Sequence, residues 1–372
     1  MEKFKPNLEY FALPKSNFIN NLVLSKYDFL PIELNSKTPC VYLTQKTDSI
    51  DKNLIRKCII SNFVFIKDDI ISKISNGELK EKEQKKLLNE INLLAKNNYS
   101  ISIIYGTSPT IFGKNELLSE SFIEFLKNTN LDIKFLTFPG EYFSSPIWAD
   151  KPRRSKIVTS QQVTIKQRFL EGLKQDEIIS YFQNSIPASA STYLSKYPIT
   201  IHSNNLASGI ERIMYCCPHC KKLFSIYSEF SCVKCRECGM VVEFSPDGTI
   251  LFSNELSSFD DIEDFQFNNL IKNDLTINQL VEYKNVIQVF YKNCKKPIKI
   301  NVILQLYAEK MIIINNLTKK QTTVEFEDIE FIEYLKNNTI KFKTKNAKQF
   351  CFIGNSNENF FIIKDLVKLN KN

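Results

Sequence analysis

The chain has 372 residues, of which 43% are hydrophobic and 24% charged. These values are typical of a globular protein and argue against a disordered chain, and the length allows two or three domains. The formal net charge of +8 combines 49 basic with 41 acidic residues, so the positive excess is spread thinly. Such a charge suits an anionic surface, whether phospholipid or nucleic acid, without selecting between them.

The N-terminal residues carry charges and prolines where a signal peptide would have an apolar stretch. No window approaches the roughly 20 apolar residues of a membrane-spanning helix. We therefore expect a cytoplasmic protein whose membrane contact is peripheral, at the inner face of the cell membrane. Only 9 glycines occur, and none lies in a nucleotide-binding GxGxxG or GxxxxGK pattern.

Residues 1 to about 200 alternate short apolar runs with amphipathic stretches, which predicts an α/β domain with a mostly parallel sheet. Helices are expected at 76–98, where leucines and isoleucines form one apolar face, and at 115–128. The expected strands are 38–44, 62–66, 100–105, 132–138 and 156–159.

Six of the ten cysteines lie within residues 215–240. Cys217-Pro-His-Cys220 and Cys235-Arg-Glu-Cys238 are two CxxC motifs separated by the fourteen residues 221–234, a spacing that lets two turns converge on one tetrahedral metal ion. KKLFSIYSEF and MVVEF predict short strands, as in a zinc ribbon. Because a four-cysteine site is closed, we expect structural Zn²⁺ and no catalysis there.

The choice of ligands has an alternative, since Cys232-Val-Lys-Cys235 is also a CxxC motif. Gly239 favours the later pair, because glycine permits the positive φ that often follows such a motif. Cys216 and Cys232 are then spare buried thiols, and His219 is a bystander inside the first motif. A redox CxxC is the competing interpretation, but thioredoxin-like motifs occur singly before a helix.

From about residue 280 the chain is rich in strand-like runs separated by polar turns. An amphipathic helical stretch at 358–369 closes the chain. Several hairpins capped by one C-terminal helix predict a small pleckstrin-homology-like β domain. The expected strand regions are 299–307, 310–316, 322–335, 339–345 and 348–354.

NNLASGIERIMYCCPHC, followed by CRECGMVVEFSPDGTI, resembles a zinc-ribbon-bearing branch of the bacterial lysophosphatidate (1-acyl-glycerol-3-phosphate) acyltransferase family. FPGEYFSSPIWADKPRRSKI and EFEDIEFIEYLKNNTIKF agree with it in the same order, so the resemblance covers nearly the whole chain. Together with the patterns above, it implies an acyltransferase-like mixed sheet flanked by helices (1–204), a zinc ribbon (205–254), a connector (255–279) and a β-rich domain (280–372).

The resemblance also implies a reaction. The family transfers an acyl group from an acyl thioester to lysophosphatidate or a related lysophospholipid, and the histidine of an NHxSxxD motif takes the hydroxyl proton. That motif falls on QKTDSID, where Asp51 keeps the aspartate, but Lys46 replaces the histidine and Asp48 the serine. Lysine ordinarily titrates at about 10.4, which is too high for a general base near neutral pH.

A second family motif, FPEGTRS, helps to hold the phosphate. It falls on IIYGTSP, where Gly106 and Thr107 survive and Tyr105 replaces the glutamate. The candidate catalytic residues are therefore Asp51 and Lys46. The candidate substrate-binding residues are Tyr105, Gly106 and Thr107.

Because both motif residues are replaced, two functions stay open: an acyltransferase with a diverged site, or an inactive relative that binds lipid or a membrane surface. Of the two histidines, His202 is the alternative base if the fold brings it to the motif. The basic run KPRRSK (151–156) is suited to phospholipid headgroups. The ribbon has few basic side chains for a phosphate track, which argues against a nucleic-acid partner.

Overall fold

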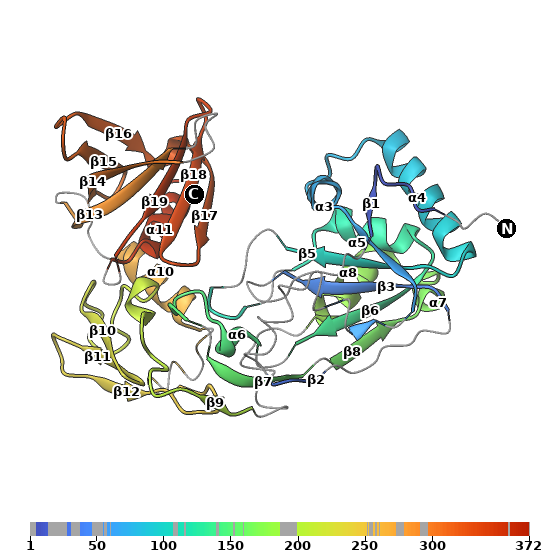
Figure 1. Cartoon of the computed structure of the whole chain (residues 1–372), viewed down its shortest axis with the longest axis horizontal. Coiled ribbons are helices and arrows are strands. Elements are labelled where there is room, and N and C mark those ends of the chain that lie inside the picture. The colour runs from blue at the N-terminus through green and yellow to red at the C-terminus, as the bar shows by residue number, and fades with distance from the viewer. Residues whose placement is uncertain are drawn as a thin grey trace. The chain divides into compact units, whose positions relative to one another are not determined.

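The computed structural model is a mixed α/β protein that divides into two compact units (Figure 1). Met1–Ser145 and Arg153–Ile201 form the first unit, and Pro146–Pro152 with His202–Asn372 forms the second. Eight α-helices and several sheets occur in the residues that the structure describes. These are 5–13, 28–30, 38–46, 55, 58–59, 61–106, 111–114, 117–138, 141–151, 153–158, 160–186, 199–250, 252, 256, 259, 261–272, 279–290, 297–355 and 358–371.

The first unit is built on a six-stranded sheet. In spatial order its strands are β1 (Phe11–Ala12), β4 (Phe63–Ile66), β5 (Ser100–Tyr105), β3 (Cys40–Gln45), β6 (Asp132–Thr137) and β8 (Ser160–Ile165). The four central strands are parallel, while β1 and β8 pair antiparallel with β4 and β6. Four of the expected strands thus form the parallel centre of the sheet, and β8 is a strand that the sequence patterns missed.

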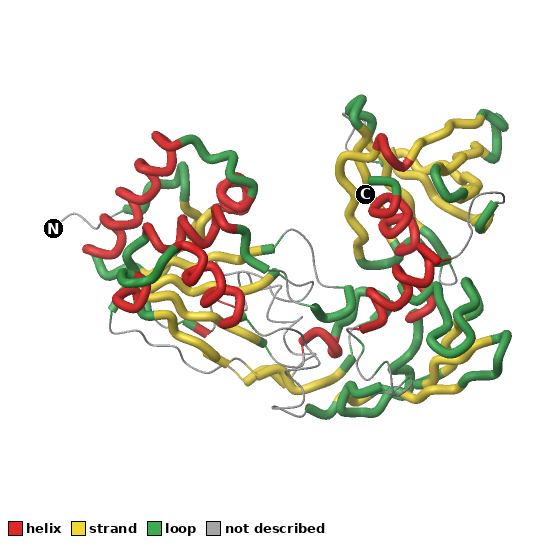
Figure 2. Tube along the Cα trace, turned by 180° about the vertical axis from the view of Figure 1, so that it is seen from behind, coloured by secondary structure: helices red, strands yellow, loops and turns green. Residues whose placement is uncertain are grey.

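Both faces of this sheet are buried. Alternate side chains of a strand point in opposite directions, so each strand contributes residues to both faces. Val41, Leu43 and Ile103 belong to one core with the buried sides of the four longest helices of this unit. Figure 2 shows the helices of this unit against its sheet. Tyr42 and Phe65 belong to a smaller core on the other face. The helices are α3 (Asp68–Ser75), α4 (Glu81–Lys96), α5 (Glu120–Asn128) and α8 (Gln175–Ser185), with the short α6 (Glu141–Ser144) and α7 (Gln167–Leu170) beside them in the chain.

The two expected helices begin later than their apolar patterns. In the first, Gly77 has a φ of +68°, which is incompatible with a helix, and α4 starts at Glu81. In the second, the backbone N–H of Phe122 donates to Ser119 Oγ at 3.3 Å. Ser119 therefore caps the N-terminus of α5, which starts at Glu120.

A separate three-stranded sheet contains the last strand expected in the first half. It has the order β2 (Asp28–Leu30), β7 (Arg154–Val158) and β9 (Ile201–His202), and β2 runs parallel to β7. The run 156–159 was expected in the main sheet, and its described residues lie in β7 instead.

The second unit contains a small antiparallel sheet in the expected ribbon. It is formed by β10 (Ile226–Glu229), β11 (Cys232–Cys235) and β12 (Val241–Glu243), and the 3-10 turn η1 (Ile210–Arg212) precedes it. The expected connector contains α10 (Asp261–Lys272), in which Ile262, Gln266 and Leu270 are buried. This segment therefore contributes to the core, and the polar Gln266 in the middle of its buried face concealed the helical pattern.

The C-terminal region is rich in strands, as expected (Figure 2). Seven strands form one antiparallel sheet in the order β16-β15-β14-β13-β19-β18-β17, and α11 (Phe361–Leu369) follows them. The strands are β13 (Val281–Phe290), β14 (Ile298–Leu306), β15 (Lys310–Asn315), β16 (Gln321–Glu325), β17 (Ile329–Leu335), β18 (Thr339–Thr344) and β19 (Gln349–Ile353).

Two features of this sheet differ from the expected pattern. The central and longest strand, β13, was not among the expected runs. The run 322–335 forms two strands, because the 3-10 turn η2 (Phe326–Asp328) separates β16 from β17. The buried Phe326 within that turn keeps the run apolar, so composition alone does not reveal the break.

Candidate functional site

Three residues expected in an acyltransferase-like site meet at the carboxyl edge of the main sheet. β3 and β5 are parallel neighbours in which Gln45 pairs with Tyr105, and the backbone N–H of Lys46 donates to the Tyr105 carbonyl oxygen at 2.7 Å. Gly106 follows with a φ of +102°, a conformation that favours glycine. Ligands of open α/β sheets bind at this edge. Asp48, Asp51 and Thr107 lie outside the described residues.

The Tyr105 side chain faces the core and not the sheet edge. It is 4% exposed, and its ring lies 6.5 Å from that of Phe122 in α5. Strand alternation explains this direction, since Ile101, Ile103 and Tyr105 all belong to the core beneath the helices. The position that the resemblance assigns to the family's glutamate therefore holds a core aromatic residue, whereas Lys46 is exposed.

The first unit contains no histidine. The two histidines of the chain, His202 at the end of β9 and His219 in the first CxxC motif, both belong to the second unit, and both are exposed. The motif base is therefore not replaced by another histidine of the same unit.

Four cysteines come together in the ribbon. The Sγ atoms of Cys217, Cys220, Cys235 and Cys238 all lie within 4.8 Å of one another. Cys217 Sγ is 3.8 Å from Cys238 Sγ, and Cys220 Sγ is 3.7 Å from Cys235 Sγ. Zn–S bonds of about 2.3 Å in a tetrahedron separate sulfur atoms by about 3.8 Å. The cluster therefore has the dimensions of a site for one metal ion, and its members are the ligands that spacing and Gly239 favoured.

The two CxxC motifs form matching turns. The N–H of Lys221 donates to the Cys217 carbonyl at 3.0 Å, and the N–H of Gly239 donates to the Cys235 carbonyl at 3.2 Å. The residue after each motif has a positive φ, +63° for Lys221 and +70° for Gly239. The positive φ expected at Gly239 is confirmed, and Lys221 adopts the same conformation without the freedom of glycine.

The environment of Cys235 favours the thiolate. Burial opposes ionisation of this thiol, but the hydroxyl of Ser225 and the backbone N–H groups of Cys238 and Glu237 lower its pKa to about 6. In contrast, burial raises the pKa of Cys217. Because metal ions bind thiolates, metal binding would displace protons from the cluster.

Cys216 and Cys232 stand outside the cluster. Burial raises the pKa of Cys216 to about 12, which keeps it a neutral thiol, and its Sγ lies 3.5 Å from the Lys221 carbonyl oxygen. Cys232 lies on β11 between Glu229 and Glu243 of the neighbouring strands. Cys232 is not among the clustered cysteines.

The segment 146–151, here named the strap, lies in the second unit. It packs against residues that precede and follow the three strands of the ribbon. The ring of Trp148 is 5.0 Å from that of Phe259 and 6.5 Å from that of Phe244. Buried Arg212 donates from Nη1 to the Trp148 carbonyl oxygen at 2.9 Å and to Asp150 Oδ1 at 2.6 Å. No pattern in the sequence indicates that residues from the middle of the chain complete this core.

The residues just before the first metal-binding motif are held by α10 and α11. The hydroxyl of Tyr215 donates to Asp365 Oδ2 at 2.7 Å, and both side chains are buried. Gln266 Oε1 accepts from the N–H of Tyr215 at 3.3 Å, and its Nε2 donates to the Ile213 carbonyl at 3.1 Å. The ribbon is thereby joined to the C-terminal helix by buried polar contacts.

We expect Asp365→Asn to stabilise the protein at alkaline pH. Burial raises the pKa of Asp365 to about 7, against the hydrogen bond from Tyr215 and the charges of Lys364 and Lys368, which lower it. The unfolded value is about 3.9, so this carboxyl favours folding fully below about pH 4 and loses its contribution as the pH rises to about 7. Asparagine still accepts from Tyr215 but cannot ionise.

The free energy of unfolding of Asp365→Asn should exceed that of the wild type by roughly 1–4 kcal/mol at pH 8, and the difference should shrink towards pH 5. Urea denaturation followed by the fluorescence of Trp148, the only tryptophan in the chain, measures it. Asp328→Asn, at an exposed position in the same unit, is the control. Parallel pH profiles for wild type and Asp365→Asn would contradict the prediction.

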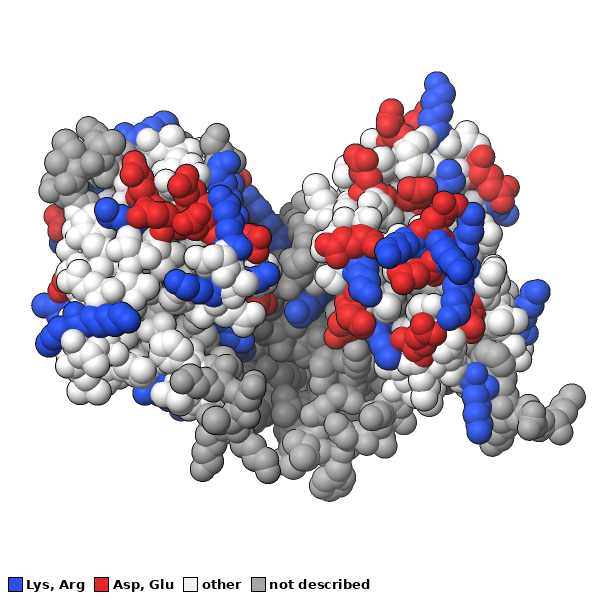
Figure 3. Space-filling view, turned by 90° about the horizontal axis from the view of Figure 1, so that it is seen from above, with Lys and Arg blue, Asp and Glu red and all other residues white. Residues whose placement is uncertain are grey.

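Part of the basic run KPRRSK is structural. Arg153 is 6% exposed and donates from Nη1 to the Phe143 carbonyl at 3.3 Å, and burial lowers its pKa to about 10. Lys151 and Arg154 remain exposed. On the face shown in Figure 3, acidic and basic side chains are interspersed. Within the described residues, no helix has both the length and the apolar character that are needed to cross a membrane.

Comparisons with known proteins identify no family for this chain. No protein-family model matches it, and no curated protein matches it. Among solved structures, the C-terminal domain of an unknown protein from Leishmania infantum is 12% identical and covers 26% of this chain and 84% of its own, with a TM-score of 0.17. Inner Membrane Complex Sub-compartment Protein 3 from Toxoplasma gondii is 14% identical and covers 28% of this chain and 86% of its own, with a TM-score of 0.20. Likenesses at these TM-scores carry no conclusion about this chain.

Proposed function

We propose that this chain is an acyltransferase-like protein that binds glycerolipids at a membrane surface without the histidine-based chemistry of the acyltransferases it resembles. The observation that carries the proposal is the sheet edge, where Lys46 and the core residue Tyr105 stand at the two motif positions. A general base must reach the acceptor hydroxyl, and the first unit has no histidine to do so. An exposed lysine at a ligand-binding edge is suited to hold a lipid phosphate.

The four-cysteine cluster supports a zinc ribbon with a structural role. Four thiolates in a tetrahedron are a donor set that zinc prefers, and the sulfur separations match its bond lengths. When bound, zinc would hold the two CxxC turns together, and the closed site would leave no position for a substrate.

The C-terminal sheet supports a pleckstrin-homology-like domain that faces the membrane. Its antiparallel order with β13 at the centre, followed by a single helix, is the arrangement expected for such a domain. Exposed lysines occupy two of its turns, Lys319 and Lys320 after β15, and Lys345 and Lys348 after β18. Each lysine near an anionic surface contributes about 1 kcal/mol.

Vesicle co-sedimentation tests this function. The full chain should bind phosphatidylcholine vesicles only when they contain phosphatidate or phosphatidylglycerol, and less strongly as salt rises. Replacing Lys319, Lys320, Lys345 and Lys348 by glutamine should weaken binding at least about tenfold. The charge-matched control replaces Lys80, Lys82, Lys85 and Lys96 in and beside α4. Equal losses for both variants, or binding to neutral vesicles, would refute the proposal.

Acyl transfer is the second candidate, and the placement of Lys46 beside Gly106 at the sheet edge favours it. Purified chain mixed with an acyl thioester and a panel of lysophospholipids would then release free thiol, and Lys46→Met would abolish the release. Vesicle binding without thiol release supports the first proposal. Release that depends on Lys46 replaces it with the second.

A further inference from the structure

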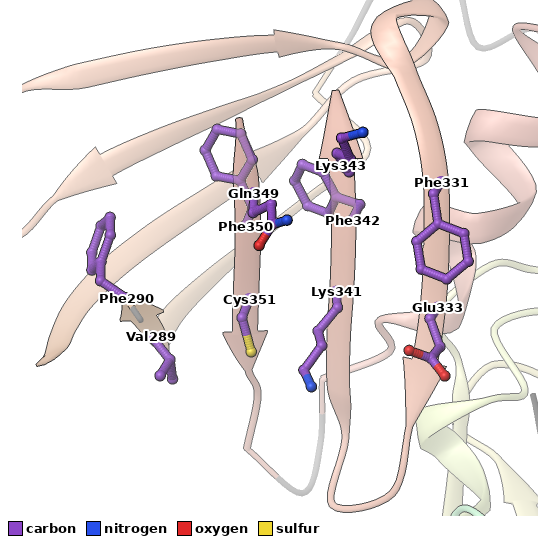
Figure 4. A pocket seen from close by; sticks show the side chains of 10 residues that line it. All are labelled: Val289, Phe290, Phe331, Glu333, Lys341, Phe342, Lys343, Gln349, Phe350 and Cys351. Atoms are coloured by element: carbon purple, nitrogen blue, oxygen red, sulfur yellow. The ribbon is translucent and has the colours of Figure 1, made fainter. Parts of the chain in front are cut away.

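A groove of about 390 Å³ crosses the C-terminal sheet (Figure 4). Its lining comes from four strands, β13, β17, β18 and β19, that are neighbours in the sheet. A volume of about 300–1,000 Å³ is usual for small-molecule sites. The groove belongs to the C-terminal sheet alone, and it shares no residue with the motif positions or with the cysteine cluster.

The strand register shows which side of the sheet the groove occupies. Glu333, Lys341 and Cys351 lie opposite one another in a row across three strands, and the next row contains Phe331 and Lys343 with Gln349. Side chains alternate along a strand, so these two rows share one face. The intervening residues Ile340 and Phe352 are buried and point to the opposite face, into the domain core, whereas Phe342 and Phe350, which pair with each other, also contribute to the lining. The groove therefore lies on the outward face of the sheet.

The floor and one wall of the groove are apolar. Val289 and Cys351 are each only 5% exposed although they lie on the outward face, so they form its recessed part. Phe331, on β17 at the edge of the sheet, is 52% exposed. An exposed aromatic ring beside a recessed apolar floor is a surface that a ligand would cover.

A lysine stands beside this apolar floor. Lys341 is half-buried, and in Figure 4 its side chain lies between those of Cys351 and Glu333. Although Lys341 and Glu333 face each other across two strands, they form no ion pair, and neither pairs with another residue in the described part of the chain. The Nζ of Lys343 is 3.4 Å from Glu330 Oε2 at the surface. A half-buried ammonium group that forms no ion pair gains from a bound anion.

We propose that this groove binds a fatty acid. The acyl chain would lie over Val289, Cys351 and Phe331, and the carboxylate would meet Lys341. Glu333 repels a carboxylate, so the headgroup lies on the side of Lys341 that faces Lys343 and Gln349, whose amide can donate a hydrogen bond. The combination of Lys341 and Lys343 with an apolar floor favours an amphiphilic anion. This site does not depend on glycerolipid binding at the first unit.

Calorimetric titration of the full chain with palmitate, below its micellar concentration, tests the proposal. We expect saturable binding of one palmitate per chain, and binding of hexadecanol at least about tenfold weaker, because the alcohol lacks the charge-assisted contact. Lys341→Met should weaken palmitate binding by about tenfold or more, while Lys341→Arg should stay close to the wild type. Phe331→Ala should weaken palmitate and hexadecanol alike.

Lys284→Met is the matched control, since Lys284 is an exposed lysine on β13 that does not line the groove. It should leave palmitate binding unchanged, and a thermal melt of Lys341→Met that matches the wild type shows that its fold is intact. Equal affinity for palmitate and hexadecanol, or equal losses in Lys341→Met and Lys284→Met, would overturn the proposal. Binding to phosphatidylglycerol vesicles with no binding of palmitate would also overturn it, in favour of a membrane surface.

Discussion

Under the proposed zinc assignment, the Cys238→Ser variant is expected to lose the metal, whereas Cys232→Ser is expected to keep it. Both cysteines form a CxxC motif with Cys235, but only Cys238 lies in the four-sulfur cluster. Cys238 is also exposed, so serine there disturbs no core packing. Structural zinc sites contribute about 10–16 kcal/mol of binding free energy in small zinc-binding peptides, which is more than the whole stability of many domains. Loss of one ligand should therefore leave the ribbon without its main source of stability.

Elemental analysis of the purified variants measures the metal content, with one zinc per chain expected for the wild type and for Cys232→Ser. Chelation gives a second readout, because Trp148 packs on Phe244, which follows β12 of the ribbon. Removal of zinc should shift the fluorescence of Trp148. If Cys238→Ser keeps the metal and Cys232→Ser loses it, the alternative CxxC pair holds the zinc and the assignment from the structure is wrong.

Gly209→Ala is expected to destabilise the second unit by about 3–5 kcal/mol, which places it among the most severe single substitutions. Gly209 has a φ of +89°, and a Cβ atom there would lie 2.4 Å from the carbonyl oxygen of Trp148. The clash is with backbone, so no side-chain rotation relieves it. The strap would have to move, and with it the oxygen that accepts from Arg212.

Two alanine variants separate the sources of this cost. Gly239 has a φ of +70° but no atom within 4 Å of a new Cβ, so Gly239→Ala should cost only the left-handed strain of about 1–2 kcal/mol. Gly172 has neither a left-handed φ nor a close neighbour, so its variant should lie within about 0.5 kcal/mol of the wild type. Urea denaturation with Trp148 fluorescence reports the second unit, and far-ultraviolet circular dichroism reports Gly172→Ala in the first. A cost for Gly209→Ala no larger than that for Gly239→Ala would show that the strap accommodates the methyl group.

The cysteine cluster was the most predictable part of the protein. Cysteine spacing reflects local turn geometry. The positive φ of Gly239 was expected because this glycine directly follows the second CxxC motif. The parallel strands were also foreseeable, because a strand that is buried on both faces is a continuous apolar run. Their ends shifted by a residue or two. The two expected helices start five residues later than their apolar patterns, at Glu81 and Glu120, and at the second of them the Ser119 cap outweighed the pattern.

Other features depended on contacts between residues that are distant in the chain. The sequence placed Tyr105 at a motif position, but only the sheet decided that its ring packs beneath α5 and away from the edge. Composition did not separate β13 from its surroundings, because the alternation of this strand is interrupted by the register shift between Tyr283 and Val286.

The sequence by itself therefore determined the protein's local features: its cysteine turns, the apolar runs of its central strands, and the residues that occupy the two motif positions. The tertiary structure decided the direction in which those motif residues face, the role of the strap against Arg212, and the groove that joins Lys341 to an apolar floor. The physical reason is the distance along the chain between the residues that determine each feature. Turn and strand patterns arise from neighbours within a few residues, whereas a side chain's partners depend on sheet order and register, which are set by the packing of the whole unit.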